Sequence, residues 1–146
     1  MKTLNRRIAS EFLGTAFLVA AVVGSGIMGE RLASGNIAIA LLANTLATGA
    51  ALVALILTFG PISGAHFNPV VTLSDAWERG VSWEETPLYI LAQILGGMFG
   101  AVTAHLMFGL PIVSASLHPR VGVSQWFSEF VATFGLLSVI WEPICI

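Results

Sequence analysis

Charged residues are scarce in this chain. Only 10% of its 146 residues are Asp, Glu, Lys or Arg, whereas 56% are hydrophobic, and the mean hydropathy is +0.89. Because a soluble domain usually carries about 25% charged residues, this composition excludes an ordinary soluble domain and indicates a membrane protein. The formal net charge of -2 also argues against a nucleic-acid partner, which would require a basic surface.

Cysteine and aspartate are equally scarce, with a single residue of each, Cys145 and Asp75. One cysteine excludes an internal disulfide framework. Asp75 falls on a short predicted helix without a neighbouring nucleophile and base, so we expect no catalytic residues and no enzyme. His66 has no Cys, Asp or second His at ligand spacing, which argues against a metal site, and we expect no cofactor.

Long apolar runs dominate what is present. Four of them can cross a hydrocarbon core of about 30 Å, and the first is too long for a signal peptide and lacks a clear cleavage site. These predicted spans are residues 8–28, 36–59, 88–108 and 123–141.

Small residues recur at four-residue spacing in the first and third spans. This spacing predicts faces on which two helices approach closely in lipid, although a general richness of membrane helices in Gly and Ala is the alternative interpretation. The residues concerned are Ala16, Ala20, Gly24, Gly96, Gly100 and Ala104.

An irregular stretch, residues 60–73, interrupts this apolar pattern directly after the second span. It holds two prolines, and a proline lacks an N–H and clashes with the preceding turn, so we expect the second helix to end at Phe59. Asn68 is a favoured N-cap and Pro69 suits the first helical position, which predicts a short helix over residues 69–78. We therefore expect a re-entrant loop over about residues 60–79, reaching roughly halfway through the bilayer.

The positive charges favour one orientation of the chain. Four of them fall on one side of the predicted spans and two on the other, which predicts a cytoplasmic N-terminus in the inner or plasma membrane. The first group is Lys2, Arg6, Arg7 and Arg79, and the second is Arg31 and Arg120.

A six-residue pattern occurs twice. Residues 10–15 read SEFLGT and residues 128–133 read SEFVAT. Three predicted spans separate the copies, so the second copy runs through the membrane in the opposite direction, which is typical of many transporters and channels. We expect a first repeat over residues 1–122 and the start of a second over residues 123–146, which ends before a second irregular loop.

Four polar residues within or beside the spans have two interpretations each. Glu11 and Glu129 either extend to the headgroups or turn inward and accept hydrogen bonds from irregular backbone, since a charge in mid-membrane is costly. His66 is either a proton shuttle or, as we favour, a neutral ring that bonds the loop backbone and faces a lumen. Asn68 either only caps the short helix or also donates into a water path.

Residues 63–72, SGAHFNPVVT, resemble the first signature loop of the aquaporin and glycerol-facilitator family (major intrinsic proteins). Residues 11–15 resemble that family's first-helix motif, whereas Val70 replaces the alanine of its usual Asn-Pro-Ala triplet. The resemblance implies an all-α membrane protein, namely an aquaporin-like half. It would have three transmembrane helices, a re-entrant loop and half-helix after the second, and a fourth transmembrane helix that opens an inverted repeat.

The resemblance also implies a pore for water or small neutral solutes such as glycerol. Backbone carbonyls would line a single file of solute, Asn68 would donate its amide hydrogens at the pore centre, and the half-helix dipole would discourage cations. The residues implied in the path are Gly64, Ala65, His66, Asn68 and Thr48, and those at the start of the half-helix are Asn68, Pro69 and Val70.

Two further roles follow from the same resemblance. Glu11 and Glu129 would brace the loops. Thr48 matches the position of the selectivity filter in the second helix, where its small side chain implies an aperture wide enough for polyols or neutral metalloid hydroxides.

The family's second Asn-Pro-Ala loop, its filter arginine and its last two helices have no counterpart in this sequence. We therefore expect a channel component in the lipid bilayer whose pore is completed by a homo-oligomer or by a second-half chain. The alternative is a truncated, non-conducting membrane protein that acts as a packing or interaction module.

Overall fold

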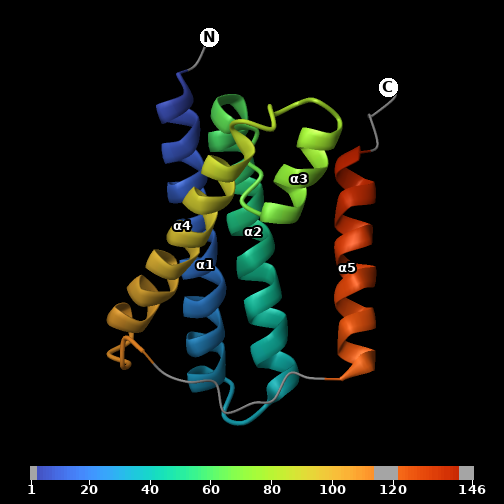
Figure 1. Cartoon of the computed structure of the whole chain (residues 1–146). Coiled ribbons are helices and arrows are strands. Elements are labelled where there is room, and N and C mark those ends of the chain that lie inside the picture. The colour runs from blue at the N-terminus through green and yellow to red at the C-terminus, as the bar shows by residue number, and fades with distance from the viewer. Residues whose placement is uncertain (1–2, 114–121, 142–146) are drawn as a thin grey trace. The chain divides into compact units, whose positions relative to one another are not determined.

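The computed structural model describes residues 3–113 and 122–141, and most of these residues are helical (Figure 1). The helices are α1 (Leu4–Leu32), α2 (Ile37–Ser63), α3 (Pro69–Trp77), α4 (Thr86–Met107) and α5 (Val123–Trp141). Four of them, α1, α2, α4 and α5, are long and apolar enough to cross a membrane. This confirms the predicted all-α membrane fold.

The chain divides into two compact units, Met1–Val113 and Ser114–Ile146. In the first unit, α1 packs against both α2 and α4, and the short α3 packs against α4 (Figure 1). The described part of the second unit consists mainly of α5. These contacts between helices all lie within the first unit, which also contains the irregular stretch.

Glycines on α4 explain how closely α1 and α4 approach. A Cβ on Gly96 would overlap the carbonyl oxygen of Phe12, and one on Gly100 would overlap that of Ala16. Ala104 continues the same face and is fully buried. The backbones of the two helices are thus in direct contact, which confirms the predicted packing face on the third span.

The prediction that the second span ends at Phe59 is wrong, because α2 continues through Pro61 to Ser63. Pro61 lies in the last turn of the helix, where its missing N–H leaves only one carbonyl without its usual partner. The helix ends at Gly64, which has a φ of 96° and donates its N–H to the carbonyl of Gly60. Glycine suits this left-handed position because it has no Cβ.

The remaining helix ends differ from the predictions by at most four residues, which is about one turn. α1 begins at Leu4 rather than at residue 8 and ends at Leu32 rather than at residue 28. A hydropathy pattern marks only the part of a helix that lies in hydrocarbon, whereas the helix continues into the headgroup region. The predicted N-cap at the start of α2 is confirmed, since the Asn36 side chain accepts from the N–H of Ile39 at 3.2 Å.

Candidate functional site

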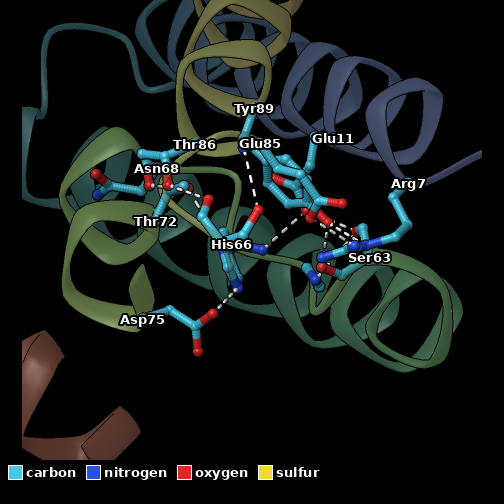
Figure 2. A network of polar contacts seen from close by, with 12 residues as sticks. Arg7, Glu11, Ser63, His66, Asn68, Thr72, Asp75, Glu85, Thr86 and Tyr89 are labelled. Carbon is cyan, nitrogen blue, oxygen red and sulfur yellow. Dashed lines mark hydrogen bonds and ion pairs between the residues drawn. The ribbon is translucent and has the colours of Figure 1, made fainter. Parts of the chain in front are cut away.

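Residues 64–68 form a short irregular segment between α2 and α3 (Figure 2). Besides Gly64, two of its residues have positive φ angles, namely Ala65 at 53° and Phe67 at 50°. Residues other than glycine rarely adopt this conformation, and each such residue is costly unless its surroundings impose it. The segment therefore depends on contacts from neighbouring helices.

Glu11 on α1 supplies the main contacts to this segment. Its side chain is 0% exposed, and its carboxylate accepts from the N–H groups of His66 at 3.1 Å and Phe67 at 2.8 Å. It also accepts from the Ser63 hydroxyl at 2.6 Å and from the Gln93 amide at 2.8 Å. The carboxylate is thus turned into the protein, and hydrogen bonds to a charged acceptor of this kind are the strong ones.

Gln93 on α4 extends this network to the short helix. Its Nε2 donates both to Glu11 and, at 2.8 Å, to the hydroxyl of Thr72 on α3. The same hydroxyl lies 3.1 Å from Nδ1 of the His66 ring. A continuous buried chain of polar groups therefore joins α1, α4, α3 and the irregular segment.

A second series of hydrogen bonds connects the end of α2 to Tyr89 on α4 and Arg7 on α1. Arg7 donates to the Tyr89 hydroxyl at 2.7 Å, and Tyr89 donates to the carbonyl of Ser63 at 3.1 Å (Figure 2). Glu85 holds the other side of the guanidinium at 2.7 Å. Ser63 is therefore fixed through its hydroxyl by Glu11 and through its carbonyl by Tyr89.

Three residues of the site, Arg7, Tyr89 and Gln93, are not among those predicted from the sequence. A signal was present, since Tyr89 and Gln93 are polar residues four positions apart in an apolar span. Arg7 and Glu11 have the same spacing on α1. Residues at this spacing share one helix face. Each pair therefore predicts a polar face on its helix, and the two polar faces are expected to pack against each other.

Asn68 occupies the N-cap of α3, as predicted. Its Oδ1 accepts from the N–H of Val70 at 2.8 Å, and Pro69 holds the first helical position. The cap uses the oxygen of the carboxamide and leaves its nitrogen as a hydrogen-bond donor.

The His66 ring is enclosed by side chains. It is bounded by Thr72, by the Tyr89 ring with centroids 5.5 Å apart, and by Asp75, whose Oδ2 lies 3.6 Å from Nε2. Its side chain is only 8% exposed, which differs from the expectation of a ring that bonds the loop backbone and faces a lumen. Asp75 is nine positions away in the sequence, so spacing along the chain does not predict its contact with His66.

Two further predicted site residues, Thr48 and Glu129, belong to other parts of the chain. Thr48 lies on α2, about 22 Å along the helix from Ser63 at 1.5 Å per residue, and its hydroxyl donates to Oδ1 of Asn44 at 3.2 Å. Glu129 is exposed on α5, in the second unit. Within residues 3–113 and 122–141, no three His, Cys, Asp or Glu side chains gather as a metal ion would require.

A helix broken inside a bundle of membrane-length helices, with its backbone held by a buried carboxylate, is typical of membrane channels and transporters. The family model described as "Major intrinsic protein" matches residues 1–143. The chain belongs to the major intrinsic protein family.

Individual relatives agree with this assignment. The chain is 50% identical over 137 residues to the aquaglyceroporin AqpS of Rhizobium meliloti (strain 1021), which covers 94% of this chain and 58% of that protein. It is 32% identical over 139 residues to aquaporin NIP6-1 of Arabidopsis thaliana, covering 94% and 45% respectively. It is 35% identical over 137 residues to aquaporin NIP1-1 of Zea mays, covering 92% and 48%. The chain thus spans about half the length of the curated relatives it matches.

Proposed function

We propose that this chain is a component of a membrane channel for passive permeation of water or small neutral solutes such as glycerol. The observation that supports this proposal most directly is which backbone groups of the irregular segment form hydrogen bonds inside the protein. The N–H groups of Ala65, His66 and Phe67 all donate to side chains inside the protein. Among the described residues, the carbonyl oxygens of Gly64, Ala65 and His66 accept no hydrogen bond. Three successive carbonyls are thus left to bind a solute, as in the filters of channels.

The start of α3 supports the same proposal. The Asn68 carboxamide follows the three carbonyls two residues further along the chain, and its nitrogen can act as a donor because only the oxygen of that group serves the cap. The helix N-terminus adds a partial positive charge, which disfavours cations. A row of acceptors followed by a donor suits a neutral molecule with hydroxyl groups, and water and glycerol both meet this requirement.

The pore needs a second half, which we propose comes from another chain or from a second copy in the opposite orientation. The support is the repeated pattern at residues 10–15 and 128–133, with residues 1–122 as the first repeat and residues 123–146 as the start of the second. Within this proposal, Glu11 and Glu129 brace the loops, and Thr48 contributes to the selectivity filter. The chain would lie in the inner or plasma membrane with its N-terminus in the cytoplasm, as the charge bias suggests.

Osmotic shrinkage of liposomes that contain the whole 146-residue chain tests this proposal. We expect water and glycerol permeability above that of empty vesicles. The substitution Asn68→Ser should lower it, because serine keeps the N-cap but removes the donor nitrogen. Asn5→Ala, an exposed residue at the start of α1, is the matched control and should leave permeability unchanged.

The permeability of liposomes that contain this chain alone tests whether two copies form the pore. Co-reconstitution with the part of aquaglyceroporin AqpS that this chain does not match tests a pore made with a second-half chain. Permeability equal to that of empty vesicles in both preparations would contradict the channel and favour a non-conducting packing module.

A further inference from the structure

The His66 ring lies among protein groups, whereas the backbone carbonyl of the same residue accepts no hydrogen bond within the described residues. The ring contacts the end of α2, where a Cβ on Gly64 would lie 2.8 Å from Nε2. On α3, the Thr72 hydroxyl lies beside Nδ1 and the Asp75 carboxylate beside Nε2 (Figure 2). These two side chains therefore influence which ring nitrogen carries a hydrogen.

The orientation of the Gln93 amide limits what the Thr72 hydroxyl can do. An ionised carboxylate only accepts hydrogen bonds, so the Gln93 atom that lies 2.8 Å from Glu11 is the nitrogen of the amide. The same nitrogen donates its second hydrogen to the Thr72 hydroxyl, also at 2.8 Å. Thr72 therefore accepts from Gln93 and has one hydrogen of its own to donate.

Two acceptors compete for the hydrogen of the Thr72 hydroxyl. Nδ1 of His66 lies at 3.1 Å, and the backbone carbonyl of Asn68 lies at 3.2 Å. If the hydrogen goes to Nδ1, a neutral ring carries its own hydrogen on Nε2. If it goes to the carbonyl of Asn68, Nδ1 carries the hydrogen and donates to Thr72, and Nε2 has a lone pair. These two arrangements are the two tautomers of the neutral ring.

The charge of Asp75 distinguishes these two tautomers. Its Oδ2 lies 3.6 Å from Nε2, so the carboxylate attracts a hydrogen on this nitrogen and repels a lone pair there. Because 3.6 Å is too long for a direct hydrogen bond, the preference is electrostatic. The ring side chain is only 8% exposed, so solvent screens this interaction less than it would at the surface.

No other carboxylate among the described residues lies this close to a nitrogen of the ring. The Tyr89 ring packs beside it and directs its hydroxyl to the carbonyl of Ser63. The remaining charged groups of this region have other partners, and they are Glu11, Arg7 and Glu85. We therefore expect the tautomer of His66 to depend on Asp75.

We propose that Asp75 is a positioning residue of the channel, which holds the His66 ring in the tautomer with its hydrogen on Nε2. The Thr72 hydroxyl then donates to Nδ1, so both ring nitrogens face protein groups and neither is offered to a solute. The backbone carbonyl of His66 is the group that remains for the solute. That part of the inference rests on the proposed function, whereas the tautomer does not.

Solid-state ¹⁵N NMR of the ring tests the tautomer directly, because the chemical shift of each nitrogen reports whether it carries a hydrogen. The whole chain is reconstituted into liposomes with His105→Gln and His118→Gln, which leave His66 as its only histidine. The spectrum is recorded above about pH 8, where an ordinary imidazole is neutral. We expect the tautomer with hydrogen on Nε2 to exceed the other at least about tenfold, because a full charge lies next to this nitrogen.

Asp75→Asn keeps the shape of the side chain and removes its charge. The ratio of the two tautomers should fall about tenfold, because the attraction and the repulsion are both lost. Glycerol permeability of the liposomes should fall as well, since the ring and the residue that carries it are no longer held in place. Glu78→Gln, at the exposed C-cap of α3, is the matched control. It removes the same charge away from the ring and should change the ratio by less than about twofold.

A hydrogen on Nδ1 in the chain with Asp75 intact, in the other tautomer or in a doubly protonated ring, would overturn the inference. An unchanged ratio in Asp75→Asn would overturn it too, as would a changed ratio that leaves glycerol permeability unaltered. The expected ratios in liposomes without any permeability would contradict the proposed channel and leave the effect of Asp75 on His66 standing. The two proposals therefore fail in distinguishable ways.

Discussion

Glu11 is the residue on which the 64–68 segment depends most. Glu11→Gln replaces one carboxylate oxygen with an NH₂ group, which would face the donors that now surround it. Because these bonds involve a buried charged acceptor, we expect a loss of about 2 to 3 kcal/mol in the free energy of unfolding. Denaturant titration of the detergent-solubilised protein, followed by circular dichroism, measures this loss.

The exposed Glu84 provides the control for that measurement. Glu84→Gln should change the free energy of unfolding by no more than about 0.5 kcal/mol, as expected for a surface substitution. Similar losses for both variants would contradict the role of Glu11 as a support of the segment.

Gly14 permits the buried position of Phe67. A Cβ at Gly14 would overlap the Phe67 ring, which is only 6% exposed, so Gly14→Ala must displace the ring and the strained backbone that carries it. We expect a loss of about 1 to 3 kcal/mol in the free energy of unfolding, as for other overpacked sites. Gly49→Ala, with no atom near the added Cβ, should leave thermal unfolding unchanged or raise its midpoint.

Residues whose role depends on local chemistry were predicted well from the sequence. Asn68 and Asn36 are N-caps because their side chains bond backbone three residues or fewer away. The contact of His66 with Asp75 could not be predicted, because it needs the irregular segment 64–68 and nearly two turns of α3. The repeated sequence around Glu11 drew attention to this carboxylate, but only the fold identifies Gln93 as its partner.

At the scale of elements, the contact of α1 with α4 depends on missing side chains. Gly96→Ala would place a methyl group on the Phe12 carbonyl oxygen, and neither backbone can move aside without separating the helices. We expect a loss of at least about 2 kcal/mol in the free energy of unfolding. Thermal melting in detergent measures it.

The neighbouring Gly97 is the matched control for this substitution. A Cβ there would meet side-chain atoms of Val19 and Thr15 at ordinary distances of 3.8 and 3.9 Å. Gly97→Ala should therefore keep the melting temperature within a few degrees of the unsubstituted chain. A large drop in the melting temperature of Gly97→Ala would show that any alanine in this part of α4 is destabilising. This result would contradict the role of Gly96 in helix packing.

The spans themselves followed from apolar run length, and the bounds of α5 agree with the prediction. The end of α2 did not, because a proline within an apolar run predicts the end of a helix, whereas Pro61 is accommodated in the last turn. Hydropathy also carries no information on which helices pack together. The pairing of α1 with both α2 and α4 became visible only in the fold.

At the scale of the whole molecule, a pore made from two copies has a testable concentration dependence. If two copies must meet, halving the protein-to-lipid ratio should lower the permeability above background about fourfold at low occupancy, by mass action. A pore formed by one copy would lose only half. Stopped-flow shrinkage over a series of ratios, with the incorporated protein measured on gels, separates the two cases.

The polar network around residues 64–68 also constrains the order in which the chain can enter a membrane. Glu11 precedes the 64–68 segment in the sequence, whereas Tyr89 and Gln93 follow it. A nascent chain of which only α1 and α2 have been synthesised therefore lacks two of the side chains that hold the segment. Until α4 arrives, irregular backbone and a charged carboxylate would face lipid without their partners. We therefore expect the translocon to shelter the segment or to leave it at the aqueous boundary, and α1 to α4 to enter the bilayer together.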